Sequence, residues 1–279
     1  MQMIYLGCAG WAYNHWRGPF YPSNLASELE FYAQYSPLNE INSTFYRIPT
    51  ETMVRGWYYY TPDNFIFSAK LTRDITHASK RKIKLELIKQ FYARLKMGLE
   101  EKFKITLVQF PPWLKYSPDS FKFLTSILDE CISQFDGQIA VEIRDESWLI
   151  PEFKDYLDSQ KIALTQTTRF PLPKEFLVSD REFHYVRLLG DRKLIPNDKL
   201  GKVFLDKKTA LSEWVTMIVQ LSNSYDTIFV LINNRFSGYA INDAITLNKA
   251  LTAEKLDVRG FERSNKYLKR QMTLQEFFS

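Results

Sequence analysis

The sequence predicts a (β/α)8 barrel, a TIM-type α/β fold in which eight parallel strands alternate with helices. Short apolar runs rich in β-branched and aromatic residues recur eight times, and segments with helical periodicity lie between them. No Gly/Ser-rich linker and no change of composition divides the 279 residues. We therefore expect a single domain over residues 1–279, with loop insertions and an extra C-terminal segment. A doubly wound open sheet is the structural alternative.

The eight predicted strands follow one another at spacings that leave room for helices. They are residues 3–8, 38–42, 65–70, 105–110, 139–144, 162–167, 183–189 and 227–233. The clearest helical segments repeat apolar residues every three or four positions and cover residues 79–101, 120–134 and 207–222. Residues 253–279 are mixed in charge, and we expect them to pack as an extra helix.

Composition narrows the functional classes. The formal net charge of +5 permits an anionic ligand, but it is too small and too evenly spread to indicate nucleic acid by itself. The start of the chain, MQMIYLGCAGW, lacks the basic and long apolar regions of a signal peptide, and no stretch suits a membrane span. The two cysteines, Cys8 and Cys131, have no metal-like spacing and fit a reducing compartment. These features predict a cytoplasmic protein without a membrane partner.

Polar side chains stand at the carboxyl ends of the predicted strands, where barrel enzymes place their chemistry. In AVEIRDESW, Glu142 and Arg144 share one face of the strand, while Val141 and Ile143 share the other. The other polar residues at strand ends are Glu40, Asn42, Lys70, Gln109, Arg187, Asn233 and Asn234. We expect them to converge at one end of the barrel. Because buried charges are costly unless paired, an ion-pair network that only supports the fold is the alternative interpretation.

The stretch GCAGWAYNHWRGPFYP at residues 7–22 holds five aromatic residues and three glycines, a composition that suits neither a helix nor an ordinary strand. It follows the first strand and therefore belongs at the same end of the barrel as the charges. We expect Phe20 and Tyr21 to pack into the next helix. Trp11, Tyr13 and Trp16 are expected to face a ligand, together with Tyr46, and to stack on a sugar or a base.

Seven ordered motifs resemble those of the YecE-like family, domain of unknown function 72. They are GCAGWAYNHWRGPFYP, NEINSTFYRIP, FIFSAKLTRDITH, LVQFPPWL, AVEIRDESW, YVRLLG and LINNRFSGYAINDA. The resemblance implies a TIM-type barrel and covers most of the chain. It implies no activity, because none is established for the family.

The chain departs from the family pattern at several motif positions. Leu189 and Arg235 stand where relatives usually have histidine, and Cys8-Ala9 replaces a pair such as Thr-Ser. Gln166-Thr167-Thr168 stands where the sixth strand commonly ends in Asp. The loss of two imidazoles and a carboxylate argues against a bound metal. The three histidines of this chain, His15, His77 and His184, are also scattered. We expect neither a metal nor another cofactor.

Four residues are candidates for catalysis. Glu142 is the first choice for a general base, and Glu40 is a second acid or the partner of Lys70. Lys70 is expected to bind an anion, form a salt bridge or form a Schiff base as an aldolase lysine does. His77 is the histidine placed to move protons near pH 7, although a structural hydrogen bond would also explain it.

The remaining candidates would bind the ligand. Arg144 and Arg187 suit a phosphate or carboxylate, and Asn42, Gln109, Asn233 and Asn234 suit sugar hydroxyls or a base edge. We therefore predict a small-molecule enzyme, a hydrolase or lyase acting on an anionic, phosphorylated or sugar-containing compound. No GxGxxG motif supports a redox cofactor. The alternative is a protein that binds a ligand or nucleic acid without turnover.

One observation separates the two roles of Glu142. A pKa raised by burial would indicate a catalytic acid or base, whereas a carboxylate held ionised between two arginines would indicate a structural role. The two carboxylates would also suit glycoside hydrolysis, which requires a defined separation between them. The sequence predicts no oligomeric state.

Overall fold

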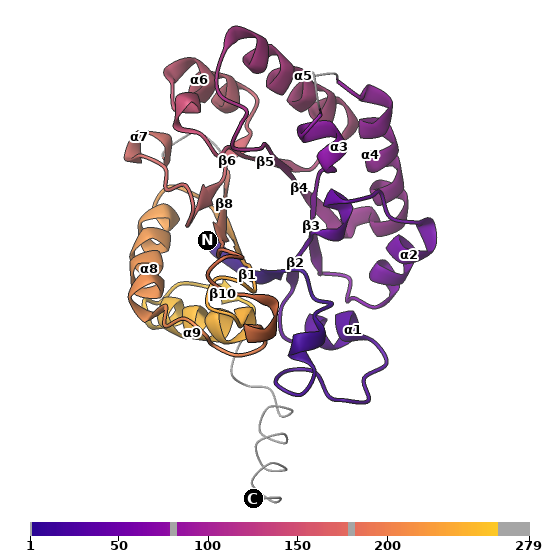
Figure 1. Ribbon diagram of the computed structural model, residues 1–279, viewed down its shortest axis with the longest axis vertical. Helices are drawn as coiled ribbons and strands as arrows, with labels where there is room; N and C mark the ends of the chain where they lie inside the picture. Colours follow the sequence, from indigo (N-terminus) through magenta and orange to yellow (C-terminus); the bar gives the residue numbers. More distant parts are fainter. Residues whose placement is uncertain (1, 79–82, 178–181, 262–279) are drawn as a thin grey trace, which may run out of the picture.

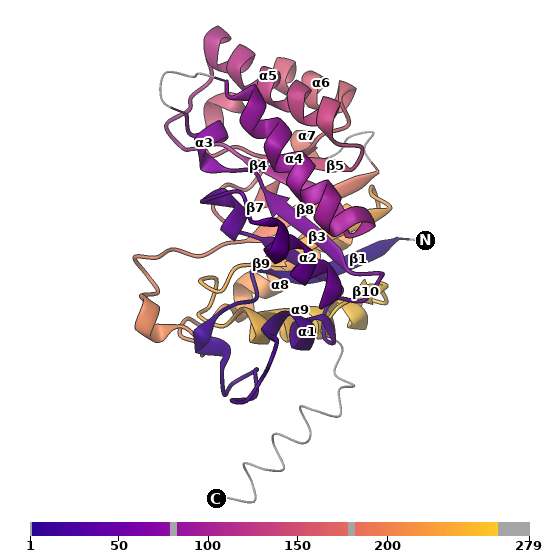
Figure 2. The same cartoon turned by 90° about the vertical axis from the view of Figure 1, so that its right-hand side faces the viewer.

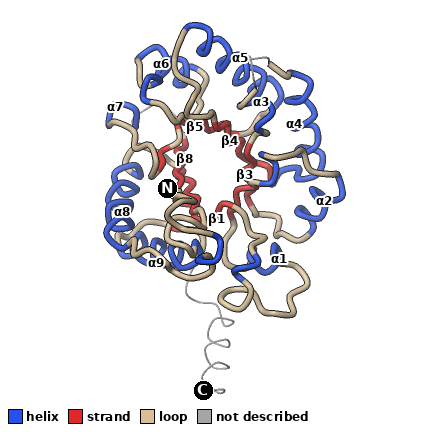
Figure 3. The backbone as a smooth tube through the Cα atoms, in the orientation of Figure 1, coloured by secondary structure: helices blue, strands red, loops and turns tan. Residues whose placement is uncertain are grey.

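A ring of parallel strands forms the centre of the computed structural model, and helices surround it (Figures 1 and 3). The structure describes residues 2–78, 83–177 and 182–261. Within them the strands are β1 (Met3–Ala9), β2 (Leu38–Ile41), β3 (Ile66–Lys70), β4 (Phe103–Gln109), β5 (Gln138–Glu142), β6 (Ala163–Leu164), β7 (Gln166–Thr167), β8 (Phe183–Leu188), β9 (Thr227–Ile232) and β10 (Val258–Arg259). Each of the eight predicted strands is present, with ends that differ by at most two residues.

The ring closes at the sixth predicted strand, which is split into β6 and β7 by one residue. The strand order is β6-β5-β4-β3-β2-β1-β9-β8-β7, so the two ends of the sheet are adjacent pieces of one segment. The N–H of Thr165 still donates to Val141 of β5, at 2.8 Å, whereas Gln166 is already paired with Val186 of β8. The chain thus changes partner at Thr165. This closure confirms the barrel and excludes the open sheet.

Helices pack on the outside of the ring (Figure 1). They are α1 (Glu28–Ala33), α2 (Glu51–Tyr59), α3 (Arg73–Thr76), α4 (Leu85–Leu99), α5 (Pro118–Gln134), α6 (Pro151–Ser159), α7 (Lys174–Leu177), α8 (Lys208–Ser222) and α9 (Ala240–Ala253). Short 3-10 turns lie at η1 (Asn14–Trp16), η2 (Ser43–Phe45), η4 (Glu100–Lys102), η5 (Glu146–Trp148) and η6 (Asn197–Lys199). At the start of α5, the Ser117 hydroxyl accepts the Ser120 N–H and Pro118 follows directly, a common N-terminal pattern.

The predicted helices over 120–134 and 207–222 are confirmed as α5 and α8. The helix predicted over 79–101 begins at Leu85, and residues 79–82 lie outside the described part of the chain.

The C-terminal segment differs from the sequence prediction. Helix α9 ends at Ala253, the first residue of this segment. The chain then forms β10, which pairs in parallel with β1 through Val258 and Ile4. The expectation of a helix was therefore wrong for residues 254–261, where backbone pairing with β1 takes over. Gly260 follows with a φ of +133°, and a Cβ there would lie 2.2 Å from the Leu6 carbonyl oxygen. Residues 262–279 of the predicted helix lie outside the described residues.

Two hydrophobic layers result from the alternation of side chains along the strands. The outer layer lies between the strands and the helices. The inner layer fills the barrel up to its middle and consists of Leu38, Ile66, Ile105, Leu107, Ala140, Ala163, Phe183, Tyr185, Phe229 and Leu231. Polar side chains continue the inward faces beyond this layer, at the carboxyl ends of the strands. We call this end the mouth. In Figure 2 the orange loop after β8 projects on the side opposite the N terminus.

Candidate functional site

The inward faces of five strands end in polar side chains that are almost completely buried. Each of these polar side chains follows an apolar or tyrosine residue of the inner layer by two positions, or by four in β3, and so shares its inward face. They are Glu40, Lys70, Gln109, Glu142 and Arg187. Their hydrogen bonds connect β2 with β8, β8 with β5, and β3 with β4. The predicted convergence of these charges at the mouth is thus observed in the structure.

Arg187 lies at the centre of an ion-pair cluster. Its Nε donates to Glu40 Oε2 at 2.8 Å and its Nη2 to Glu40 Oε1 at 2.6 Å, while its Nη1 donates to Glu142 Oε2. The hydroxyl of Tyr185 lies 2.9 Å from Glu40 Oε2 and 2.7 Å from the Ser68 hydroxyl. Arg187 therefore spends its donors on two carboxylates inside the barrel. Its expected role in ligand binding stays a prediction.

Arg144 completes the cluster from the outer side. Its Nε and Nη2 donate to Glu142 Oε1 at 2.8 and 2.7 Å. Its side chain is 25% exposed, against 3% for Arg187 and 1% for Glu142. Among the described residues, its Nη1 has no partner. Arg144 is thus the cation of the cluster that still presents donors to solvent.

The cluster keeps Glu142 ionised. Burial acts to raise the pKa of this carboxyl, but the positive charges of Arg187, Arg144 and Lys70 outweigh it and lower the pKa to about 2. In the same way, the two carboxylates raise the pKa of Arg187 despite its burial. Both oxygens of Glu142 accept from arginines. This is the arrangement that indicates a structural role, so we no longer assign Glu142 the part of a general base.

Lys70 lies in the mouth and has no carboxylate partner within the part of the chain that the structure describes. Its Nζ donates to Gln109 Oε1 at 2.7 Å and lies 3.9 Å from the centre of the Phe45 ring. The expected pairing of Lys70 with Glu40 is wrong, because Arg187 occupies that carboxylate. Burial, followed by the positive charge of Arg187, lowers the pKa of Lys70 to about 7, although Glu142 and Glu40 act in the opposite direction.

His77 lies next to Lys70, at the end of α3. Its ring is 5.2 Å from Phe45, the ring that Lys70 also contacts, and 6.4 Å from Trp113, and its Nδ1 lies 2.8 Å from the Thr76 hydroxyl. Burial and the charge of Lys70 lower the pKa of His77 to about 4. The imidazole is therefore neutral at pH 7 and can accept a proton only weakly.

The aromatic residues of the loop after β1 pack mainly on the protein itself. Trp16 is completely buried and donates from Nε1 to Asn234 Oδ1 at 3.0 Å, which corrects its expected role in ligand stacking. Trp11 packs edge to face on Trp57 of α2, and the Tyr13 hydroxyl donates to the Ala9 carbonyl at 2.6 Å. Phe20 and Tyr21 are buried against Phe31 of α1, as predicted.

The remaining predicted ligand-binding residues divide between the rim and the core. Tyr46 is 60% exposed and Asn42 half-buried, both near η2 at the mouth. Gln109 is tied to Lys70, and its Nε2 donates to the Phe110 carbonyl at 2.6 Å. Asn233 is half-buried and accepts the Arg235 N–H. Asn234 is buried and accepts the first N–H of α9, at Ala240, so the structure corrects its expected place in the mouth.

A family model described as "Protein of unknown function DUF72" matches residues 5–267. The chain belongs to this family. The UPF0759 protein YunF of Bacillus subtilis is 24% identical over 277 residues, covering 90% of this chain and 96% of that protein.

Solved structures with similar folds come from the same family. A DUF72 family protein of Enterococcus faecalis has a TM-score of 0.73 at 21% identity, covering 94% of this chain and 99% of that one. One of Thermotoga maritima has a TM-score of 0.73 at 24% identity, covering 90% and 100%. The resemblance stated from the motifs and the barrel fold are thereby confirmed.

Two side chains that depart from the motif pattern of the DUF72 family, those of Arg235 and Gln166, make hydrogen bonds within the fold. Arg235 donates to the Ile195 carbonyl and to Asn197 Oδ1, and so holds the loop after β8. Gln166 faces outward from β7, and its Oε1 accepts the Leu172 N–H at 2.8 Å. Leu189 exchanges backbone hydrogen bonds with the Thr168 hydroxyl, at 2.7 Å each.

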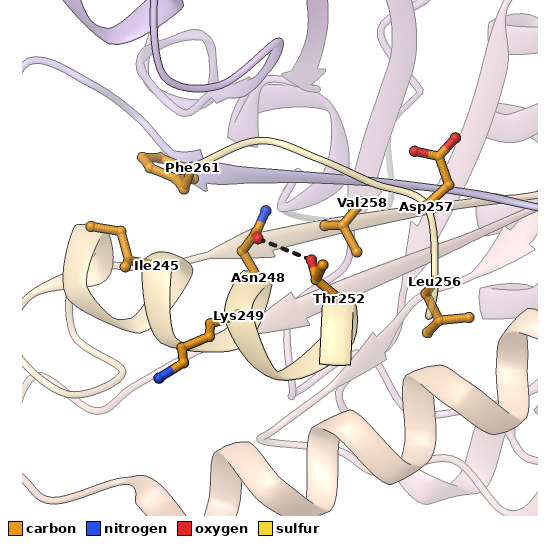
Figure 4. A pocket seen from close by; sticks show the side chains of 8 residues that line it. All are labelled: Ile245, Asn248, Lys249, Thr252, Leu256, Asp257, Val258 and Phe261. Atoms are coloured by element: carbon orange, nitrogen blue, oxygen red, sulfur yellow. Dashed lines mark hydrogen bonds between the residues drawn. The ribbon is translucent and has the colours of Figure 1, made fainter. Parts of the chain in front are cut away.

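The cavities lined by described residues include two that lie outside the barrel interior. One of about 480 Å³ lies between the ends of β7 and β8 and the helix α8. The other, of about 460 Å³, lies between α9 and β10 (Figure 4). In its lining, the Thr252 hydroxyl donates to Asn248 Oδ1 at 3.3 Å, and Asn248 Nδ2 donates to the Gly260 carbonyl. In the described residues, His, Cys, Asp and Glu side chains form no group of three suited to a metal ion. Over the same residues, every helix is too short or too polar to cross a membrane.

The sequence reasoning missed two side chains of the mouth. Tyr185 lies two positions before Arg187 in HYVRLLG and therefore shares its inward face, a signal that could have identified it. Phe45 comes from η2 after β2 and reaches Lys70 of β3. No periodicity places a residue of a short 3-10 turn, so the sequence held no comparable signal for it.

Proposed function

We propose that this DUF72 protein is a small-molecule enzyme whose site is the barrel mouth, with Lys70 as the reacting group and an anionic compound as the substrate. The observation that supports this most is the environment of Lys70: its amine is buried near the carboxyl groups of Glu40 and Glu142, yet both carboxyl groups are paired with arginines. A lysine that serves only the fold is expected to be paired. Chemistry of the lyase or acid–base type fits an amine with a pKa of about 7.

The anionic nature of the substrate is inferred from Arg144. This side chain is held by Glu142 on one edge and turns its free edge to solvent. A guanidinium in this position can bind a carboxylate or a phosphate through parallel hydrogen bonds. His77, neutral at pH 7, and the exposed Tyr46 stand at the same end of the barrel and supply hydrogen-bonding groups.

Thermal-shift measurements test this proposal. The panel holds sugar phosphates, 2-oxo acids, nucleotides and short single-stranded oligonucleotides, applied to the wild type and to Arg144→Gln. We expect one class of small anions to raise the melting temperature of the wild type and not that of the variant. Arg259→Gln is the matched control, because Arg259 is exposed in β10 and pairs only with Asp257 among the described residues.

The alternative is a protein that binds nucleic acid through the same mouth. It would give no shift with small anions and a salt-sensitive shift with oligonucleotides, since phosphate contacts release counterions. That result would end the small-molecule proposal.

A further inference from the structure

We propose that Lys70 is a covalent catalytic residue that forms a Schiff base with an aldehyde or ketone carrying a carboxylate or phosphate. This inference rests on the proposed function and deepens it by naming the reacting bond and the substrate class. It depends on three features of the mouth: the partners of the amine, its protonation state, and the cation next to it.

The first feature is that the amine has few partners. Among the described residues, Nζ has one hydrogen-bond acceptor, Gln109 Oε1 at 2.7 Å, and an aromatic face, Phe45, at 3.9 Å. Neither an amide oxygen nor a ring removes the lone pair of a neutral amine. The side chain is 8% exposed, whereas Glu40 and Ser68 beside it are completely buried. The amine is therefore held in place, and Lys70 is the most exposed of these three residues.

A second buried lysine shows what a structural lysine looks like in this fold. Lys102 donates to the Tyr58 carbonyl at 2.8 Å, to the Thr61 carbonyl at 2.7 Å and to the Thr61 hydroxyl at 3.3 Å. These contacts satisfy all three N–H bonds of an ammonium group and close the end of α2. Lys70 has one such contact. Of these two buried lysines, Lys70 is therefore the one whose amine has fewer acceptors to lose when it becomes neutral.

The second feature is protonation. Around Lys70 lie the charged groups Arg187, Arg144, Glu142 and Glu40, and their combined effect with burial brings its pKa to about 7. Near neutral pH a large share of this lysine is unprotonated, which is the form that attacks a carbonyl. An ordinary lysine with a pKa of 10.5 has on the order of a thousandth of its molecules in that form at pH 7.

The reaction balances without an oxidant or reductant. The nitrogen lone pair attacks the carbonyl carbon and gives a carbinolamine. The carbon–oxygen bond then breaks, and the oxygen leaves as water with the two hydrogens of the amine. The resulting imine becomes an iminium cation when it takes a proton. Glu142 and Glu40 favour positive charge at this nitrogen, as they do for the ammonium form of Lys70.

The third feature selects an anionic substrate. Arg144 is close enough for its charge to lower the pKa of Lys70, and it comes from the end of β5, next to β4. Its solvent-facing edge can hold the carboxylate of a substrate whose carbonyl carbon meets Nζ. A 2-oxo acid or a phosphorylated aldehyde carries both groups, whereas a neutral aldehyde carries only one.

Borohydride trapping tests the proposal on the full-length protein. Glyoxylate, an anionic aldehyde, and acetaldehyde, a neutral one, are the probes, and sodium borohydride reduces any imine to a stable secondary amine that peptide mass spectrometry locates. We expect Lys70 to be labelled on the order of a thousandfold faster than surface lysines at pH 7, because its neutral fraction is larger by about that factor. The labelling rate should rise with pH through about 7.

Variants separate this inference from the proposed function. Lys70→Met should lose the adduct and Lys102→Met should keep it. Arg144→Gln should slow trapping of glyoxylate more than trapping of acetaldehyde, because it removes the anion-binding group for glyoxylate alone, whereas the rise in the pKa of Lys70 slows both probes. Wild-type mapping is decisive even where a variant fails to fold.

The Schiff base at Lys70 and the anionic nature of the substrate can each be contradicted by a separate result. Anions that stabilise the wild type without any adduct at Lys70 would overturn the Schiff base and leave the proposed function intact. An adduct at Lys70 with equal rates for both probes, and no stabilisation by anions, would overturn the anionic substrate and leave the amine as the nucleophile.

Discussion

The two sides of the barrel mouth use buried charge in opposite ways. On the side of β2, β8 and β5, Arg187 holds Glu40 and Glu142 so that donors and acceptors match. On the side of β3 and β4, Lys70 meets an amide oxygen and a ring. Lys70 is 8% exposed and Arg187 3%, so the two sides differ mainly in the partners of their charged groups.

The comparison shows how a barrel can contain a lysine whose charged form is destabilised by its surroundings. The arginine cluster supplies a rigid, nearly neutral wall, and its charges fix the protonation of the neighbouring amine. Removing a group from the paired side should destabilise the fold, whereas removing the charge from the unpaired side should stabilise it at neutral pH. This opposition is the basis of the predictions below.

The largest effect is expected for Arg187→Met. The change leaves Glu40 and Glu142 buried, with Arg144 as the one remaining cation in contact with either carboxylate. Breaking a buried ion pair by removing one partner costs about 3–5 kcal/mol of unfolding free energy, and here two pairs are broken. Urea unfolding at pH 7 measures the loss.

Arg55→Met is the control, since Arg55 is exposed and pairs with Glu51 on the surface of α2. It should change the unfolding free energy by less than about 1 kcal/mol. A loss below about 1 kcal/mol for Arg187→Met would remove the distinction between the two sides of the mouth.

A smaller effect of opposite sign is expected for Lys70→Met. The folded state lowers the pKa of Lys70 from 10.5 to about 7, so between these values the unfolded chain binds the extra proton. Stability must then rise with pH over this window, and the destabilisation is complete below pH 7. The full change in unfolding free energy corresponds to roughly 5 kcal/mol. Lys70→Met should abolish this rise, as urea unfolding at pH 6, 8 and 10 would show.

Lys102→Met is the matched control for Lys70→Met. It removes a buried lysine but leaves the Tyr58 and Thr61 carbonyls without their donor, so it should destabilise the protein. The idea of an unpaired amine would fail if the wild type and Lys70→Met showed the same dependence on pH between 7 and 10.

Unfolding at acid pH tests how much the ion pairs of Glu142 stabilise the fold. The folded state lowers the pKa of Glu142 from 4.5 to about 2. The ionised form of Glu142 therefore stabilises the folded state fully above pH 4.5, and this contribution to the unfolding free energy is lost as the pH falls through about 2. It amounts to about 3 kcal/mol. Glu142→Gln should remove it, giving a flatter loss of stability between pH 5 and 2. Glu254→Gln, which changes an exposed carboxylate after α9, should leave the wild-type curve unchanged.

The fold could be predicted from the sequence because each strand carries its own signal. Alternation within runs such as AVEIRDESW fixed both the strand and the face of Glu142 and Arg144, and the ends of parallel strands must meet. The tail could not be predicted in the same way. The pairing of Val258 with β1 depends on a partner more than 250 residues away in the chain, and a two-residue strand has no period.

The pairing inside the mouth also lay beyond the sequence. Periodicity places Glu40, Lys70, Glu142 and Arg187 in one layer, but the choice of partner depends on distances across the barrel. Arg187, and not Lys70, pairs with both carboxylates because the planar fork of a guanidinium group matches the geometry of a carboxylate, which an ammonium group does not. Trp16 shows the same limit: its ring could face a ligand or Asn234, and only the folded loop decides.

The smallest effect is expected for Tyr185→Phe, a test of how completely the paired side is satisfied. The change removes a hydroxyl bonded to Glu40 and Ser68, while Arg187 still donates twice to the same carboxylate. Loss of one such hydrogen bond costs about 1 kcal/mol. Tyr46→Phe at the exposed rim should cost nothing measurable in the same urea titration. A loss of several kcal/mol for Tyr185→Phe would mean that the tyrosine, rather than Arg187, holds Glu40 in place.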